Sequence, residues 1–205
     1  MGTHLGATRS PPSFPRPIRQ RSGGRSERVR TKVAEAVLSL LSEGCSSVSV
    51  AEVAERSGVH RTTVYRWWPT PSDLLREALT VHTARLTTPD EGSWAADVSA
   101  LVFSLADFFS DPVEMAMNAA MASGADPEGD EVQIEHWMPV MVGLSEIVDR
   151  AKGRGEIAED TDAGTLMYLL VSPLLMHTVL FHDTPDPQLV RQLAAAVTRA
   201  FAAAP

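Results

Sequence analysis

The sequence of 205 residues lacks several features that define whole classes of protein. It contains a single cysteine, Cys45, which excludes an intramolecular disulfide and a cysteine cluster for zinc. No apolar run reaches the length of a membrane-spanning helix, and the N-terminus has no apolar core of a signal peptide. We therefore expect a cytoplasmic protein without membrane contact. Cys45 itself predicts either a buried structural thiol or a redox sensor.

Enzyme signatures are missing as well. The chain has no HExxH, no glycine-rich phosphate loop, no GxSxG, and no Glu-x-x-His pair of the kind that builds di-iron sites in helical bundles. His177 and His182 are five residues apart and do not share a helical face well. We therefore predict no metal site, no cofactor and no enzymatic activity, and a small helical enzyme stays open as another class of function.

The net charge of -8 is distributed unevenly along the chain. Residues 1–70 contain 11 Arg and Lys against 5 Asp and Glu, whereas residues 71–205 contain 7 against 21. A basic N-terminal third joined to an acidic remainder is what a nucleic-acid-binding head on a non-binding body needs. The acidic part is expected to repel a duplex and to restrict contact to the head.

The most specific pattern lies in residues 49–68, SVAEVAERSGVHRTTVYRWW. Ser49 can cap a short helix that runs to Ser57, and Gly58 allows the chain to turn where a side chain would be strained. A second helix is expected from about His60 to Trp68. Each helix has an apolar face for packing. Two short crossing helices of this kind are typical of a helix-turn-helix, the alternative being an ordinary surface helical hairpin.

The second helix would then read the major groove of double-stranded DNA. Its outward side chains are suited to phosphates and base edges, because they combine guanidinium, hydroxyl and aromatic groups. The predicted DNA-binding residues are Arg28, Ser49, Arg61, Thr62, Thr63, Tyr65, Arg66 and Trp67.

At this point the sequence resembles the TetR-type transcriptional regulators. The resemblance is carried by the helix before the motif, by VAEVAERSGVHRTTVYRWW, and by SDLLREAL after a short spacer. In that family, the positions of Tyr65 and Trp68 form a Tyr-x-x-aromatic ending of the recognition helix. Two positions depart from the family pattern. Pro71 stands where relatives have a lysine that contacts a DNA phosphate, and Ala51 stands where many have a polar or basic residue.

Three parts are predicted along the chain. Residues 1–24 are rich in proline and arginine and read as a disordered basic arm, or as an arm that reaches the minor groove through Arg19, Arg21 and Arg25. Residues 25–70 form the DNA-binding domain, whose first helix runs from near Ser26 to Glu43. Residues 71–205 form a helical domain for effector binding and dimerisation.

Helical signals repeat throughout residues 71–205. Ser72 is expected to cap a helix that reaches about Leu86, and Ser93, Asp111 and Asp186 begin later helices. A helix ending at Gly124 is followed by one over residues 130–152 that should kink or break at Pro139, and another spans residues 162–182. No alternating strand pattern competes with them. The sequence therefore predicts an all-α protein of about nine helices, with a three-helix head and a larger helical body.

Two further partners are expected. One small head reads too few base pairs for useful specificity, so we expect a homodimer, formed through the last two apolar helices, on a palindromic operator. Methionine and aromatic side chains of the body can line an adaptable pocket for a small apolar effector, although core packing explains each one alone. The candidates are Phe103, Phe108, Met117, Met121, Trp137, Met141, Tyr168 and His177.

The functional prediction is thus a ligand-responsive regulator, by family default a repressor. The alternative is a helical DNA-binding protein that answers to a protein partner or to no effector.

Overall fold

The computed structural model describes residues 24–45, 48–123 and 127–203. Over these residues it has nine α-helices: α1 Arg25–Ser42, α2 Val50–Ser57, α3 Arg61–Trp67, α4 Pro71–Thr83, α5 Trp94–Phe109, α6 Pro112–Ser123, α7 Pro127–Gly153, α8 Ala163–Leu180 and α9 Pro187–Phe201. Apart from an isolated bridge between Ile157 and Ala202, the described residues form no β-structure. The prediction of an all-helical protein is confirmed. Residues 1–23, most of the predicted N-terminal arm, lie outside the described residues.

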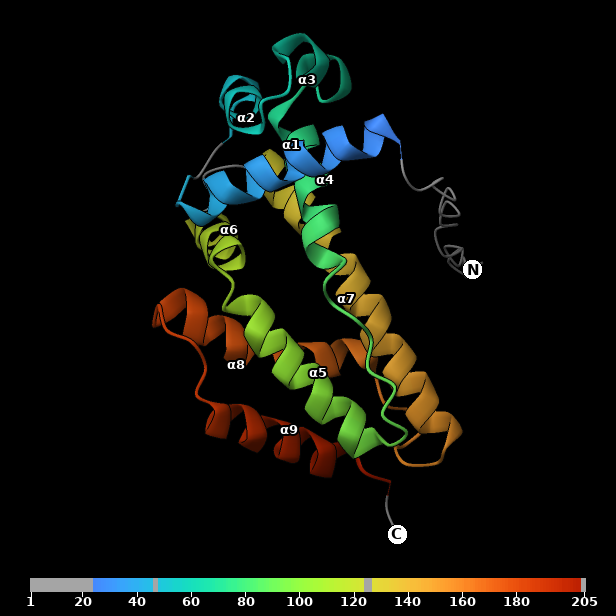
Figure 1. Ribbon diagram of the computed structural model, residues 1–205. Helices are drawn as coiled ribbons and strands as arrows, with labels where there is room; N and C mark the ends of the chain where they lie inside the picture. Colours follow the sequence, from blue (N-terminus) through green and yellow to red (C-terminus); the bar gives the residue numbers. More distant parts are fainter. Residues whose placement is uncertain (1–23, 46–47, 124–126, 204–205) are drawn as a thin grey trace, which may run out of the picture.

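The head occupies one end of the molecule, where α2 and α3 lie above α1 (Figure 1). Apolar side chains of α1 to α4 form a shared head core, which includes Val37, Val53, Val64 and Leu74, all fully buried. These residues recur at helical spacing on each element, so burial of the apolar stripes fixes how the short helices cross. The head is therefore a three-helix unit closed from below by α4.

The head core continues into the body. Val113 and Met117 of α6 and Val132 of α7 belong to the same cluster of buried side chains. A larger cluster made by α5, α7, α8 and α9 forms the body core, with Leu105, Leu144 and Leu170 among its most buried members. In Figure 1, α4 leads from the head to the body, and α8 and α9 lie at the end remote from α3. The geometry of α4 thus sets the relation between the two cores.

The beginning of α4 differs from the sequence-based prediction. Ser72 was expected as the N-cap, but Thr70 has that role, since its hydroxyl accepts from the Asp73 amide and the Asp73 side chain accepts in return from the Thr70 amide. Pro71 suits the first helical position because it has no amide proton to leave unsatisfied. The helix also ends at Thr83 rather than near Leu86.

Three other helix starts agree with the sequence signals, whereas α7 begins at Pro127 rather than at residue 130 and α8 ends at Leu180 rather than at residue 182. Ser93, Asp111 and Asp186 accept hydrogen bonds from the amides that follow them, as expected of helix caps. The sequence predicts a kink or a break at Pro139, and of these the break is wrong, because α7 continues through this residue. A proline inside a helix removes one backbone hydrogen bond, and the packing of α7 against α4, α5 and α8 compensates for that loss. Gly124, the predicted end of α6, lies outside the described residues.

The expectation that no segment could span a membrane is wrong by length and composition. α8 has 18 residues with a mean hydropathy of 1.6, which makes it the one described helix that is long and apolar enough. Only 22% of this segment is buried within the monomer. Core helices of soluble proteins have the same length and composition, so this finding is weak evidence for a membrane span. It does identify α8 as a helix with a large uncovered apolar surface.

Candidate functional site

The turn between α2 and α3 is fixed by local interactions. The Ser49 hydroxyl accepts from the Glu52 amide at 3.2 Å, and the Glu52 carboxylate accepts from the Ser49 amide at 3.1 Å, which together make a capping box. The Ser49 hydroxyl also donates to the Glu52 carboxylate at 2.5 Å, and this hydrogen bond, together with the one from the Ser49 amide, lowers the pKa of Glu52. Gly58 then adopts a left-handed conformation with φ of 65°, which favours glycine. The His60 side chain accepts from the Thr62 amide and caps α3.

One face of α3 is buried and the other is free. Val64 is fully buried, and Trp68, the residue after the helix, is 4% exposed in the head core. The Trp68 indole Nε1 donates to Glu77 Oε2 of α4 at 3.2 Å. Because a buried indole N–H normally finds a partner, this hydrogen bond ties the end of α3 to α4.

The free face of α3 presents the side chains expected to contact DNA. Arg61, Thr62, Tyr65 and Arg66 are exposed, and Thr63 and Trp67 are half-buried. An Arg61 guanidinium nitrogen donates to the Tyr65 hydroxyl at 3.1 Å, and the guanidinium lies 5.3 Å from the centre of the Tyr65 ring. Arg61 and Tyr65 are four residues apart and therefore adjacent on the helix. This pair holds a cation and an aromatic edge together on the outer surface of the head.

Two other predicted DNA contacts flank α3. Ser49 is exposed at the N-terminus of α2, and Arg28 is exposed on α1. Ala51 is half-buried, and Pro71 is exposed at the first position of α4. The carboxylate of Asp73 occupies the N-terminus of α4 through its capping box, so a negative charge stands close to the position where relatives have a lysine.

Arg56 of α2 is held away from this surface. Its guanidinium donates to both carboxylate oxygens of Glu43 and, at 2.8 Å, to the Ser39 hydroxyl of α1. The hydrogen bond from Arg56 lowers the pKa of the Glu43 carboxyl. Arg56 therefore connects α2 to the end of α1.

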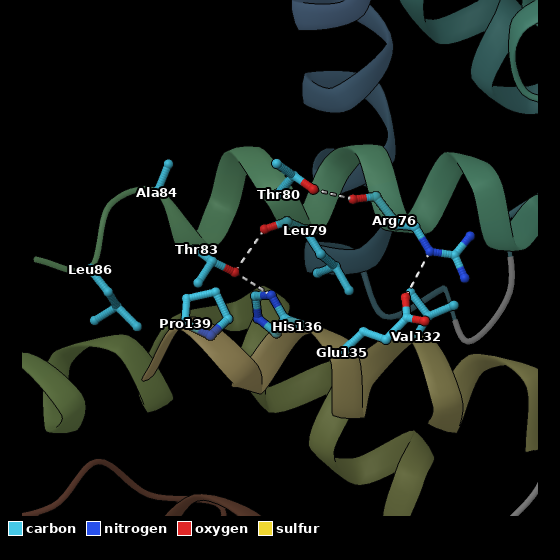
Figure 2. A pocket seen from close by; sticks show the side chains of 10 residues that line it. All are labelled: Arg76, Leu79, Thr80, Thr83, Ala84, Leu86, Val132, Glu135, His136 and Pro139. Atoms are coloured by element: carbon cyan, nitrogen blue, oxygen red, sulfur yellow. Dashed lines mark hydrogen bonds and ion pairs between the residues drawn. The ribbon is translucent and has the colours of Figure 1, made fainter. Parts of the chain in front are cut away.

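A cleft lies between α4 and α7, directly below the head (Figure 2). Its volume is about 410 Å³, a size suited to a small ligand. Arg76 of α4 donates to Glu135 Oε2 of α7 at 2.8 Å on one side of the cleft. The lining residues are Arg76, Leu79, Thr80, Thr83, Ala84, Leu86, Val132, Glu135, His136 and Pro139.

The sequence-predicted effector residues do not line this cleft. Phe108 is buried in the body core, with Phe103, Trp137 and Met141 packed against it, whereas Met117 belongs to the head core. The remaining three lie elsewhere: Met121 is half-buried on α6, Tyr168 is 77% exposed on α8, and His177 is half-buried beside Phe181.

A buried polar cluster next to the cleft was not predicted. It joins His82 of α4, Glu114 of α6 and His136 of α7, whose side chains are almost inaccessible to solvent. Glu114 Oε1 lies 2.7 Å from His136 Nε2 and 3.1 Å from His82 Nε2. Burial opposes ionisation of Glu114, but the contacts with His136 and His82 outweigh it and lower the pKa of this carboxyl. We call these three residues the His–Glu–His cluster.

Sequence signals for this cluster are weak. The only hint is Glu114 within the otherwise apolar stretch PVEMAM. Its partners leave no local pattern, because His82 lies 32 residues before it and His136 lies 22 residues after it. Within the described part of the chain, no group of three or more His, Cys, Asp or Glu side chains is arranged to hold a metal ion.

Comparisons with known proteins match both the helix-turn-helix head and the helical body. A family model described as "Tetracyclin repressor-like, C-terminal domain" matches residues 88–197, which is more than half of the chain. A second model, "IclR helix-turn-helix domain", matches residues 33–67 and thus most of α1 to α3. The solved TetR transcriptional regulator from Agrobacterium tumefaciens has the same fold, with a TM-score of 0.68 at 17% identity over 85% of this chain and 95% of that one.

Two curated relatives are transcriptional regulators. The HTH-type transcriptional regulator AqdR of Rhodococcus erythropolis is 33% identical over 170 residues, covering 82% of this chain and 81% of the relative. The uncharacterized HTH-type transcriptional regulator YdeS of Bacillus subtilis (strain 168) is 25% identical, covering 75% and 79%. Members of this family are regulators and not enzymes, which confirms the expectation of no enzymatic activity. The helix-turn-helix head, the matching body and these relatives together show that the chain belongs to the TetR family of ligand-responsive, DNA-binding transcriptional regulators.

Proposed function

We propose that this TetR-family regulator is a cytoplasmic repressor that binds a palindromic operator as a homodimer and is released by a small apolar effector. The observation that carries the proposal is the double role of α4. Leu74 and Leu79 of α4 are buried in the head core, and Leu79 also lines the cleft against α7. A molecule that enters the cleft must therefore contact the helix on which the head rests.

The proposed DNA-binding domain comprises residues 25–70, with α3 in the major groove. Arg61, Thr62, Tyr65 and Arg66 are exposed on one face of α3, which supports direct contact with base edges and phosphates. Ser49 and Arg28 are exposed, which supports the proposal that they contact the DNA backbone on either side. Thr63 and Trp67 are half-buried and contribute at the edges of this face.

The proposed dimer forms through α8 and α9, in the domain of residues 71–205. Several large apolar side chains of α8 and of the residue after it are exposed: Tyr168, Leu169, Met176, Leu180 and Phe181. Exposed large apolar side chains gathered on one helix are typical of an interaction site. A twofold axis at this end would leave both heads free to contact half-sites about 34–36 Å apart on one face of the duplex.

Effector binding is proposed to separate α4 from α7. The cleft is lined by apolar side chains such as Leu86, Val132 and Pro139, which favour an apolar molecule. A change in the tilt of α4 would change the distance between the two heads and oppose simultaneous contact with both half-sites. A shift from mostly bound to mostly free requires about 5.5 kcal/mol of differential binding energy.

For larger effectors, we propose that the same cleft can extend into the body. The ring of Phe108 lies 5.9 Å from that of His136 at the cleft wall, and Trp137 follows in the chain. Side-chain rotation there would extend the cleft toward Phe103 and Met141, which pack against the body core, and toward Met117 and Met121 of α6. Tyr168 and His177 of α8 would contribute only if this extension reached that helix.

Selection of bound sequences from random duplex DNA tests the proposal. We expect the purified protein to select a site with twofold symmetry and half-sites one helical turn apart, and to sediment as a dimer. Selected sites without symmetry, or a monomeric protein on the DNA, would contradict the homodimer model. Promoter fusions with and without the gene for this regulator then distinguish repression from activation.

A further inference from the structure

The hydrogen bonds around Thr83 determine where protons lie in the wall of the cleft. The Thr83 hydroxyl donates to the Leu79 carbonyl oxygen at 2.8 Å, and the same oxygen contacts His136 Nδ1. A hydroxyl has only one proton, and a carbonyl oxygen can only accept. With that proton committed to Leu79, the contact with His136 requires that His136 Nδ1 carries a proton and donates to Thr83.

The other side of the His136 ring faces a carboxylate. His136 Nε2 lies 2.7 Å from Glu114 Oε1, and the lowered pKa of Glu114 keeps that carboxyl ionised at neutral pH. A carboxylate accepts only, so His136 Nε2 also carries a proton. Both nitrogens of His136 are then protonated, and the buried ring is an imidazolium paired with Glu114.

His82 completes the cluster in the neutral form. Its Nε2 lies 3.1 Å from Glu114 Oε1. Both of its ring nitrogens are buried without a hydrogen bond of good geometry among the described residues, and Nε2 is the one that faces the Glu114 carboxylate. A buried ring nitrogen is least costly without a partner when it is unprotonated. Its ring lies 4.9 Å from Phe108 and 5.9 Å from His136, between centres. The His–Glu–His cluster thus holds one positive and one negative charge.

This arrangement places a strong hydrogen-bond donor at an apolar cleft. Of the three cluster members, only His136 lines the cleft, and Thr83 lines it beside the ring (Figure 2). Leu79 and Pro139 line the cleft beside this donor, and the other charged donor of the lining, the Arg76 guanidinium, is paired with Glu135. The contact between Thr83 and His136 connects α4 to α7, so a ligand that took the donor from Thr83 would loosen the connection to the head.

Building on the proposed function, we propose that the cleft selects apolar molecules that carry one acceptor oxygen of the carbonyl type, and that this oxygen replaces the Thr83 hydroxyl as acceptor of the His136 Nδ1 proton. Recognition and release are then the same event. An apolar molecule without the oxygen can fill the cleft but leaves the Thr83–His136 contact in place. A charged hydrogen bond in an apolar site discriminates strongly, by about tenfold or more.

The first test measures the protonation of the histidines directly. Side-chain nitrogen spectra of the full chain labelled with ¹⁵N-histidine report each ring nitrogen. We expect one histidine at pH 7 with both nitrogens protonated, assigned to His136 by its loss in the paired variant Glu114→Gln/His136→Leu, which removes both charges together. We expect His82 to be neutral with its proton on Nε2. A neutral His136 in the folded protein overturns the proposal.

The second test compares two probes with the same skeleton, butyrophenone and butylbenzene, which differ by one ketone oxygen. In NMR titrations we expect the wild-type protein to bind the ketone about tenfold more tightly than the hydrocarbon. Thr83→Val removes the competing hydroxyl. We expect it to bind the ketone about tenfold more tightly than the wild-type protein does, with an unchanged affinity for the hydrocarbon. Thr83→Ser keeps the hydroxyl and serves as the matched control. The paired variant Glu114→Gln/His136→Leu should bind both probes equally.

Equal binding of the two probes to the wild-type protein, binding of neither, or an unchanged ketone affinity in Thr83→Val overturns the proposal. Operator selection and sedimentation do not depend on these probes. A failure of ligand recognition is therefore distinguishable from a failure of the proposed repressor function, which would appear as loss of a symmetric operator.

Discussion

The head and the body place charged side chains in opposite environments. In the head, Arg61 and Tyr65 pair on an exposed helix face, where solvent screens the charge and the fold does not depend on it. Below the head, Glu114 is fully buried and pairs with histidines of two other helices. The comparison separates two roles of charge. Exposed groups of the head serve recognition at little cost in stability, whereas the buried group contributes to the folded state itself.

The largest expected effect is on the buried side of this comparison. Glu114→Ala leaves the imidazolium of His136 without its counter-ion, and removal of one partner from a buried ion pair costs about 3–5 kcal/mol. Urea unfolding at one fixed protein concentration measures the loss. Glu146→Ala, which removes an exposed carboxylate on α7, is the matched control and should change the free energy of unfolding by less than about 0.5 kcal/mol. Similar losses in both variants would mean that the buried carboxylate contributes no more to stability than an exposed one.

The same carboxyl predicts a dependence of stability on pH. Contacts with His136 and His82 outweigh burial and hold the pKa of Glu114 below its ordinary value of 4.5. Its contribution is therefore fully present above pH 4.5 and is lost as the pH falls through the pKa of the folded state. Unfolding free energies between pH 7 and pH 3 should fall more steeply for the wild-type protein than for Glu114→Gln. Parallel curves for the two proteins would contradict this assignment.

The third effect lies on the exposed side. Arg61→Ala should weaken operator binding by about 1–3 kcal/mol, because a guanidinium that contacts DNA is lost. Its free energy of unfolding should change by less than about 0.5 kcal/mol, since the side chain is exposed. Fluorescence anisotropy with the selected operator measures the affinity. Arg199→Ala, an exposed arginine on α9, should bind like the wild-type protein. Full affinity in Arg61→Ala would mean that α3 does not read the groove.

The smallest expected effect concerns the helix cap at Ser49 in the head. Ser49→Ala removes the hydroxyl that accepts from the Glu52 amide, and loss of such a cap costs about 1 kcal/mol of stability. If Ser49 also contacts a DNA phosphate, operator affinity should fall as well. Ser49→Asp keeps the cap but adds a negative charge, so it should restore stability and still bind DNA weakly. Normal DNA binding by Ser49→Asp would limit Ser49 to its structural role.

The same contrast explains what the sequence could predict. The helix-turn-helix depends on interactions between residues close in sequence, such as Ser49 with Glu52 and the turn at Gly58, and these leave local signals. Apolar periodicity located the body helices for the same reason. The predicted N-cap of α4 is wrong because Thr70 and Ser72 are both good caps, and only the backbone shows that the helix begins at Pro71, directly after Thr70. The sequence predicts a kink or a break at Pro139 because the local sequence does not show how α7 packs against neighbouring helices.

The cleft between α4 and α7 could not be predicted from the sequence, for a different reason. It depends on how α4 lies against α7, and the relevant residues are more than 50 positions apart in the chain, as with Thr83 and His136. A list of methionines and aromatics from the body could not indicate which of them face an open space. The predicted residues Phe108 and Trp137 pack around Phe109 instead: Trp137 stacks on the Phe109 ring, whereas Phe108 makes edge contacts with Phe109 and with Trp137.

The hydrogen bond from Trp68 to Glu77 also makes the protein its own optical reporter. An indole beside a carboxylate emits at a wavelength that depends on their separation, and this pair joins α3 to α4. Of the four tryptophans in the chain, Trp67 and Trp68 belong to the head, whereas Trp94 and Trp137 belong to the body. Replacing Trp94 and Trp137 by phenylalanine would leave emission from the head alone. Any change in how α3 lies against α4 could then be followed in real time, in solution, without any added dye.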